Sequence, residues 1–513
     1  MSETKKLFKS AGIVSFFTLM SRILGFIRDV VIARLFGTGM AAQAFVVAFR
    51  IPNTLRHLVG EGAANAAVIP ILSEYLAKKD KREFWHLTHV LLSLMVIILA
   101  LLAIIGTLLA PFIVRVVAFG FADDPAKLAL TVRMTRIMFS FIFFIGLTAY
   151  VMGVLNTLKH FVAPAAGSCF LNITMIIFGL YLCRYFSEPV IGLAVAVLIG
   201  GFLQLCIQIP PLLKEGFRFR FSFQFRHPAI ARIGRLLIPR MVGSSIYQLN
   251  IFADTMFASL GKIVGEGAVA ALYYANRLIQ FPTAIFGIAM ATACLPTMSR
   301  QAVANDIEPM KKTLMTGLQS LVVLLIPSTV GLFILAHPTV SVLFQRGAFD
   351  TVSTDITRLA LIFYCIGIYA YSGARLVTTC FYAMRDTTTP VLITFICLVV
   401  NVVLNYLLMW PLQVGGLALA TSVSSTVNFF LLIYVLRKKI GPLGCVKVLR
   451  TFLPVSIASL GMAVICRFSF DYYVQHLSTS LSLLLTIMTG MVAYAVLGWI
   501  LGVFKGVHLR LWH

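Results

Sequence analysis

The chain has 513 residues, of which 60% are hydrophobic and only 12% are charged. Ordinary soluble proteins carry roughly twice that charged share, so the composition excludes this class. The formal net charge of +24 would suggest nucleic-acid binding in a soluble protein. In a membrane protein the same excess indicates lysines and arginines on cytoplasmic loops, and we expect no nucleic-acid partner.

Apolar stretches long enough to cross a bilayer recur along the whole chain. At roughly 20 residues per span, about fourteen are expected. They lie near 11–36, 40–72, 86–117, 131–157, 162–185, 189–212, 234–260, 267–298, 313–336, 355–383, 388–410, 413–437, 448–467 and 479–503. Apolar residues are continuous in these runs and do not alternate with polar ones, so the runs predict an all-α polytopic membrane protein and not a β-barrel.

Basic residues concentrate in the loops that follow even-numbered spans. These clusters lie near 78–82, 214–226, 300–312 and 437–439. An excess of lysine and arginine marks cytoplasmic loops, so we expect both termini on the cytoplasmic side.

The chain repeats itself at one offset. VIPILSEYLAKKD resembles CLPTMSRQAVAND, and LNTLKHFVAP resembles FYAMRDTTTP, each pair 226 residues apart. An even number of helices per copy makes the copies parallel, with the functional site expected between them. We therefore expect one six-helix lobe over 1–225, a second over 226–440, and two additional helices over 441–513.

Polar and charged residues interrupt the first two spans. The residues concerned in SRILGFIRD and RIPNTLRHLVGEGA are Ser21, Arg22, Arg28, Asn53, Arg56 and Glu61. Charges are costly in hydrocarbon and survive where they face a protein interior or a watery cavity. Because the excess is positive, we expect a cationic cavity and an anionic ligand.

Arginines recur at matching places in the two halves. Arg277 in YYANRLIQFP occupies the place of Arg50 in VAFRIPN. Arg22 and Asp29 share a helix face, which allows one to neutralise the other. A guanidinium fork matches phosphate oxygens in two places at once, so several converging arginines favour a phosphate or pyrophosphate.

The alternative is that each arginine snorkels to an interface or forms a structural pair. It is favoured for arginines near predicted span ends, namely Arg34, Arg50, Arg133 and Arg136. The cavity interpretation is favoured for Arg28, Arg56 and Arg277. Glu61 is either a proton carrier or the counter-ion of Arg56 or His57.

The sequence carries no catalytic motif, since Walker A, GxSxG and HExxH patterns are all missing. A membrane enzyme acting on polyprenyl phosphates would need an acid-rich or metal-binding motif on one helix face, and none occurs. The nine cysteines include no CxxC pair and are interpreted as small core residues. We expect a transporter without a cofactor, driven by an ion gradient, the membrane potential or the substrate's own gradient.

Four oxygen-bearing side chains form a candidate cation site. Asp254 is a lone carboxylate in the seventh span, Asn401 and Asn405 share a face of the eleventh, and Thr421 lies in the twelfth. A carboxylate, two amide oxygens and a hydroxyl are hard ligands suited to sodium. The alternative is that Asp254 pairs with Arg277 or with a neighbouring hydroxyl.

Four segments together resemble the MurJ (MviN) family of lipid II flippases, within the superfamily of multidrug and polysaccharide exporters. They are SRILGFIRD, ARLFGTGMAAQAF, RIPNTLRHLVGEGA and YYANRLIQFP, and the resemblance covers nearly the whole chain. It implies a flippase that moves the undecaprenyl-pyrophosphate-linked peptidoglycan precursor (lipid II) from the cytoplasmic to the periplasmic leaflet of the bacterial inner membrane by alternating access. It also implies two six-helix lobes around a V-shaped cavity, with a groove for the lipid tail formed by the last two helices.

The resemblance assigns substrate-binding roles residue by residue. The family's cavity arginines fall on Arg22, Arg28, Arg56 and Arg277, and Ser21, Asn53 and Glu61 also match. Two positions depart from the pattern, because Gln43 and Asn276 stand where the family often has acids. In the sodium site, Asn405 likewise replaces a typical Asp, which weakens any such site.

The partners implied are lipid II, membrane lipids and the cell-wall synthesis machinery. The competing function is a cation-coupled exporter of another polyprenyl-linked sugar or of drugs. A basic cavity disfavours cationic drugs.

Overall fold

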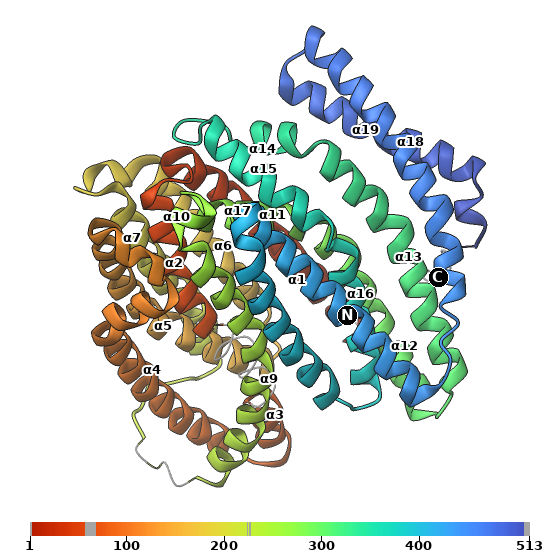
Figure 1. The fold of residues 1–513 in the computed structure, drawn as a ribbon. Coiled ribbons are helices and arrows are strands. Elements are labelled where there is room, and N and C mark those ends of the chain that lie inside the picture. The colour runs from red at the N-terminus through yellow and green to blue at the C-terminus, as the bar shows by residue number, and fades with distance from the viewer. Residues whose placement is uncertain (1–2, 57–67, 223, 225–226, 507–513) are drawn as a thin grey trace. The chain divides into compact units, whose positions relative to one another are not determined.

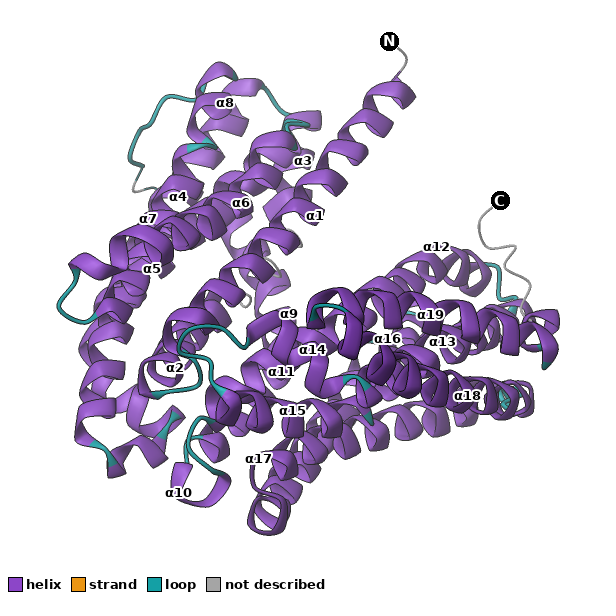
Figure 2. Ribbon diagram, turned by 90° about the horizontal axis from the view of Figure 1, so that it is seen from above, coloured by secondary structure: helices purple, strands orange, loops and turns teal. Residues whose placement is uncertain are grey.

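The computed structural model describes residues 3–56, 68–222, 224 and 227–506. In this part of the chain the regular structure is entirely helical, and Figure 2 shows helices joined by loops. The chain divides into two compact units, Met1–Leu260 and Gly261–His513. The predicted all-α fold is confirmed.

The first unit contains nine α-helices within the described ranges. They are α1 (Glu3–Phe36), α2 (Met40–Arg56), α3 (Ile69–Lys78), α4 (Lys81–Val117), α5 (Pro125–Thr157), α6 (Val162–Ile177), α7 (Pro189–Cys206), α8 (Ile209–Lys214) and α9 (Pro228–Ala258). Helix α9 therefore belongs to the same compact unit as α1 to α8. The three-part division at 225 and 440 stays a proposal.

The second unit continues from α10 to α19. Its helices are α10 (Gly261–Val264), α11 (Ala268–Pro282), α12 (Ala289–Val303), α13 (Ile307–Ile334), α14 (Ala336–Phe344), α15 (Thr351–Cys365), α16 (Ile368–Ala383), α17 (Thr388–Ile440), α18 (Val446–His476) and α19 (Thr479–Ile500). The long helix α17 is broken at Gln413, where φ is 50°, shortly after Pro411. Helix α18 packs against both α13 and α19 (Figure 1).

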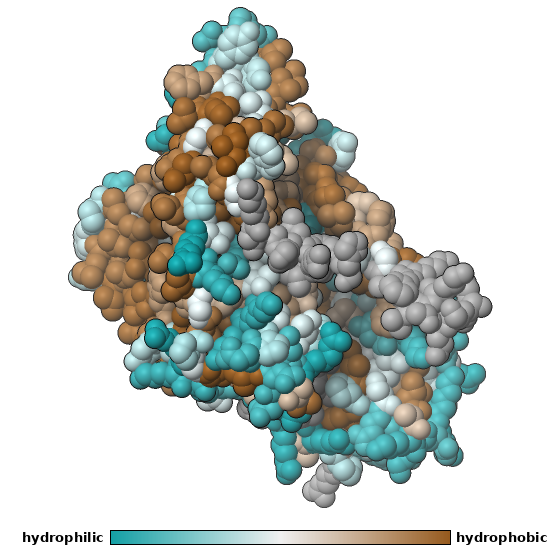
Figure 3. Space-filling view, turned by 90° about the vertical axis from the view of Figure 1, so that its right-hand side faces the viewer, coloured by the Kyte–Doolittle hydropathy of each residue, from teal (hydrophilic) through white to brown (hydrophobic). Residues whose placement is uncertain are grey.

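Many of these helices suit a bilayer rather than water. Among the described residues, nine helices are long and apolar enough to cross a membrane, or ten when α15 and α16, bent by 46°, count as one span. Large apolar side chains such as Leu108 and Trp499 are more than 70% exposed. Figure 3 shows apolar side chains over much of the displayed face and hydrophilic ones toward its lower edge. Hydrocarbon accounts for such exposure because it imposes no hydrophobic penalty.

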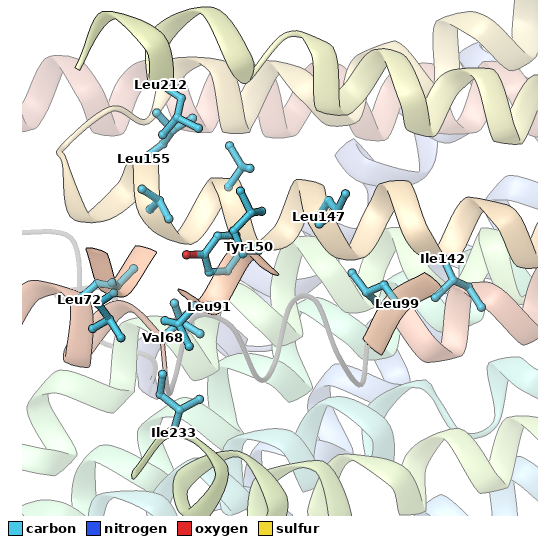
Figure 4. Packing of buried hydrophobic residues seen from close by; sticks show 14 of the residues in the cluster. Val68, Leu72, Leu91, Leu99, Ile142, Leu147, Tyr150, Leu155, Leu212 and Ile233 are labelled. Atoms are coloured by element: carbon cyan, nitrogen blue, oxygen red, sulfur yellow. The ribbon is translucent and has the colours of Figure 1, made fainter. Parts of the chain in front are cut away.

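Helices α4 and α5 form much of the core of the first unit. Figure 4 shows Tyr150 among leucine side chains such as Leu91 and Leu147. The Tyr150 hydroxyl donates a 2.8 Å hydrogen bond to the Thr88 carbonyl oxygen, so its polar end is satisfied inside the core. Glycine allows the close approach of the two helices, because a Cβ on Gly106 would lie 2.1 Å from the Phe139 ring.

The predicted internal repeat recurs in the backbone of both units. Lys159 and Arg385, which are 226 residues apart, both have left-handed φ values, 63° and 62°. The next amide closes the turn in each case, from His160 to the Leu155 carbonyl at 2.8 Å and from Asp386 to Phe381 at 2.9 Å. Both units thus end a helix with the same left-handed turn before a proline-containing helix.

Candidate functional site

Arg28 on α1 lies at the centre of a buried polar network within the first unit. Its Nε and Nη2 donate to Oδ1 of Asp29 at 3.1 and 2.8 Å, and its Nη1 donates to Oδ1 of Asn172 on α6 at 3.0 Å. Nδ2 of Asn172 donates in turn to the Ser21 carbonyl at 3.2 Å. Arg28 is 6% exposed and Asp29 is fully buried, so this ion pair is shielded from solvent.

The network differs from the sequence expectation in one respect. Arg22, which shares a helix face with Asp29 and was considered able to neutralise it, is exposed, whereas Arg28 forms the ion pair with the carboxylate. Neighbouring residues point to different helix faces, but the long arginine side chain curls back to the adjacent aspartate. Asn172 was missed by the sequence analysis. The sequence feature that could have revealed it is an amide side chain inside the apolar run LNITMII, because a polar side chain in an apolar helix needs a partner.

Helices α2 and α9 are joined by polar side chains inside the first unit. Arg50 donates through Nη1 to the hydroxyl of Thr255, and Thr54 donates to Oε1 of Gln248 at 3.2 Å. Arg50 is half-buried, which fits the expectation that it forms a structural pair. This contact ties the arginine to α9.

Three further candidates of the first unit lie on the same two helices. Asn53 and Arg56 are half-buried in the last turns of α2. Asp254 is half-buried on α9 beside Thr255. Glu61 lies outside the described residues.

Arg277 on α11 belongs to a polar stripe in the second unit. Its Nη2 donates to the Tyr273 hydroxyl at 3.1 Å, and its guanidinium lies 5.2 Å from the centre of that ring. Its Nη1 donates to Oε1 of Gln280 at 3.3 Å, and Gln280 donates to Oδ1 of Asn276. The residues are three or four positions apart, so one helix face orients the half-buried guanidinium.

Three of the four candidate cation ligands lie together in α17. Nδ2 of Asn405 donates to Oδ1 of Asn401 at 2.7 Å, and Nδ2 of Asn401 donates to the Thr421 hydroxyl at 3.4 Å. Both asparagines are fully buried and Thr421 is 6% exposed. Among the residues described, three or more His, Cys, Asp or Glu side chains never gather as a metal site would require. The amide and hydroxyl oxygens fit a hard cation, while the only carboxylate of the set, Asp254, belongs to the first unit.

A family model described as lipid II flippase MurJ matches residues 32–489. The chain belongs to the MurJ family. This match spans most of the chain, including α2, α11 and α17 with their candidate residues. The family predicted from the sequence is therefore confirmed, and it is a family of transporters rather than enzymes.

Similar proteins from several bacteria support this membership. The chain is 36% identical over 437 residues to the lipid II flippase MurJ of Burkholderia cenocepacia, covering 84% of each chain. It is 36% identical over 436 residues to the probable lipid II flippase MurJ of Vibrio cholerae, covering 84% of this chain and 82% of that protein. It is 31% identical over 505 residues to the probable lipid II flippase MurJ of Bdellovibrio bacteriovorus, covering 98% of this chain and 96% of that protein.

Solved structures show the same fold. A structure of lipid II flippase MurJ in an inward closed conformation superposes with a TM-score of 0.80 at 26% identity, covering 96% of this chain and 98% of that one. An inward-facing multidrug transporter of the MATE family matches with a TM-score of 0.71 at 15% identity, over 82% of this chain and 95% of its own. The second likeness concerns the polytopic helical fold alone.

Proposed function

We propose that this protein is a lipid II flippase of the bacterial inner membrane. It moves the undecaprenyl-pyrophosphate-linked precursor from the cytoplasmic to the periplasmic leaflet by alternating access. The observation that carries the proposal is the match to the MurJ family over residues 32–489, together with relatives named as lipid II flippases over four fifths or more of their length.

Arg22, Arg28, Arg56 and Arg277 are the proposed pyrophosphate-binding residues. Their guanidinium groups are always charged and offer paired donors to phosphate oxygens. Arg28 and Arg277 are already held by neighbouring side chains, which lowers the entropy lost when an anion binds. Ser21, Asn53 and Glu61 complete the proposed substrate-binding set.

The buried state of Arg28 constrains how it would act. Three of its N–H donors already engage Asp29 and Asn172. A pyrophosphate that reaches Arg28 would therefore have to share the guanidinium with Asn172 or displace it. In either case Asp29 remains beside the guanidinium and keeps it oriented. Asp29 and Asn172 are thus proposed as positioning residues for Arg28.

Sodium is the proposed coupling ion. Asp254 would supply the charge, while Asn401, Asn405 and Thr421 would supply neutral oxygens. Binding would require the Asn401–Asn405 amide pair to turn an oxygen toward the ion. The test is sodium-dependent thermal stabilisation of the purified protein compared with Asp254→Ala, with potassium as the reference salt. Equal stabilisation of the two proteins by sodium would leave coupling to protons or to the membrane potential.

The function itself is tested by complementation. A bacterial strain depleted of its own lipid II flippase accumulates the precursor in the inner leaflet, and this chain should restore the appearance of the precursor in the outer leaflet.

The Arg277→Ala variant should fail to restore the outer-leaflet precursor at equal membrane abundance. Arg184→Ala is the matched control, because Arg184 also lies over a tyrosine ring but is exposed, in the short 3-10 helix Cys183–Tyr185. Continued accumulation with the wild-type chain would refute the proposal. Docking to cell-wall enzymes is proposed only as a consequence of this role.

A further inference from the structure

A groove of about 480 Å³ lies on the second unit, along the half of α17 that follows Gln413. On α17 it is lined by Val423, Thr426, Val427, Phe430 and Tyr434, and on the other side by Ile366. The α17 residues recur at helical spacing, so they form one stripe along the helix. None of them belongs to the proposed substrate or sodium sites.

The break between α15 and α16 creates this groove. The two helices meet at a bend of 46°. Gly367 at the bend lies so close to α17 that a Cβ there would come within 2.9 Å of the Ser422 Cα. Ser422 donates a 2.8 Å hydrogen bond to the Phe363 carbonyl and so satisfies backbone freed by the break. Ile366 is left projecting, 53% exposed, as one wall.

The groove offers hydrocarbon contacts and almost no polar ones. The Thr426 hydroxyl, its main polar group besides Tyr434, already donates to the Ser422 carbonyl at 2.8 Å. Phe430 and Tyr434 are 62% and 55% exposed and form the rim. An unbranched apolar chain gains van der Waals contacts there that a flat helix surface would not give.

One end of the stripe is cationic. Lys438, one turn beyond Tyr434, places its Nζ 4.7 Å from the centre of the Tyr434 ring. Arg437 lies beside it in the last turn of α17 and is exposed. The third basic residue, Lys439, is paired with Asp386. Lys438 and Arg437 therefore supply the net positive charge at the mouth of the groove.

The length of the stripe matches one leaflet. From Val423 to Tyr434 the helix rises by about 16 Å at 1.5 Å per residue. Half of a hydrocarbon core of about 30 Å is close to the same length. A fatty acyl chain with its headgroup at Lys438 fills this distance, whereas a polyprenyl chain is far longer.

We propose that this groove binds an anionic glycerophospholipid. One acyl chain lies between Ile366 and Phe430, and the phosphate headgroup contacts Lys438 and Arg437. Because the basic run at 437–439 is expected on the cytoplasmic side, the lipid comes from the cytoplasmic leaflet. This site goes beyond the proposed flippase function and does not depend on it.

Fluorescence quenching by brominated lipids tests the site. The full chain, with its four tryptophans replaced by phenylalanine, carries Phe430→Trp and is reconstituted in phosphatidylcholine bilayers. A small fraction of brominated phosphatidylglycerol should quench this tryptophan more than the same fraction of brominated phosphatidylcholine. Each basic residue should enrich the anionic lipid in the groove by roughly fivefold over its bulk fraction. Val403→Trp is the matched control, because Val403 is an exposed residue on the other half of α17. It should be quenched equally by both lipids.

Two further arms decide the headgroup and the chain. Arg437→Gln with Lys438→Gln should reduce quenching by phosphatidylglycerol to the phosphatidylcholine level. Undecaprenyl phosphate in excess should not relieve the quenching. The proposal is overturned by equal quenching by the two lipids at position 430, by unchanged preference in the double variant, or by displacement with undecaprenyl phosphate, which would assign the groove to polyprenyl chains.

Discussion

At the scale of single residues, the ion pair of Arg28 and Asp29 is buried on both sides, with side chains 7% and 0% exposed. Removing one member of a buried ion pair leaves an uncompensated charge and costs about 3–5 kcal/mol, whereas exposed pairs contribute about 0–1 kcal/mol. The first unit contains both kinds, since Arg133 and Glu188 form a 2.7 Å pair with side chains 54% and 38% exposed. The two pairs therefore provide a matched comparison.

We predict that Asp29→Ala lowers the free energy of unfolding by about 3–5 kcal/mol, because it strands a buried guanidinium. Glu188→Ala, the control, should lower it by less than about 1 kcal/mol. Arg28→Lys should be well expressed but inactive in complementation, since an ammonium lacks the bidentate fork. Chemical unfolding in detergent measures the first two effects. Equal destabilisation by the two alanine variants would contradict the burial of the Arg28–Asp29 pair.

A second residue-scale prediction concerns Asp386, in the loop between α16 and α17. Burial works to raise its pKa, but hydrogen bonds from Lys439 and Thr389 and the charge of Lys439 outweigh it and lower the pKa to about 2 from 3.8. A depressed pKa in the folded state contributes stability above pH 3.8 that is lost as pH falls toward 2.

The wild type should therefore melt at a higher temperature than Asp386→Asn at every pH above about 4. The difference in melting temperature should be constant in that range and should shrink as the pH falls below about 4. Asp355→Asn serves as the control, because Asp355 is 66% exposed and lies 3.9 Å from its partner Arg358. A margin that stays constant down to pH 2 would show that Asp386 does not titrate in this range.

At the scale of elements, both units reuse the same device with different side chains. His160 follows the left-handed turn in the first unit and pairs with Glu215 at 2.7 Å, while Asp386 holds the equivalent place and pairs with Lys439. In the first unit this contact joins the segment before α6 to the residue after α8, and in the second it joins the segment before α17 to the last turn of α17. The carboxylate stands on the opposite side of the contact in the two units, so the repeat keeps the connection rather than the residues.

Helix contact through glycine gives an element-scale prediction for α4 and α5. Gly106→Ala on α4 should destabilise the protein by about 1–3 kcal/mol, because the new methyl group meets the buried Phe139 ring. Gly153→Ala on α5 is the matched control. Its nearest neighbour would be 3.8 Å away, so the gain in helix propensity of up to about 1 kcal/mol should prevail. Thermal melting of both variants distinguishes the two effects, and stabilisation by Gly106→Ala would contradict the described packing.

At the scale of the whole molecule, the basic loops predict how the chain is oriented across the membrane. With both termini cytoplasmic, cysteines placed at Asp124, Asp350 and Asp471 should react with a membrane-impermeant reagent added from outside. Cysteines at Lys79 and Lys439 should not. The experiment uses a background without the native cysteines, eight of which are buried or half-buried. The reverse labelling pattern would overturn the orientation.

Hydropathy and motifs along the chain were enough to predict the fold class and the family. Hydrophobic length along a helix is a local property, so the runs that became α4, α5 and α19 could be recognised without tertiary information. The offset of 226 residues likewise predicted an internal repeat, and the structure has the same left-handed turn at Lys159 and Arg385. The polar positions in α1 and α17 were visible because polar residues stand out in apolar helices.

The partners of these residues, in contrast, became known only from the way the helices pack in three dimensions. The contact between Arg28 and Asn172 joins positions 144 residues apart, and no local pattern encodes such a pairing. The membership of α9 in the first unit, and the groove made by Ile366 against α17, depend equally on how helices pack. Packing is set by the simultaneous fit of many side chains, which hydropathy and spacing along one helix do not contain.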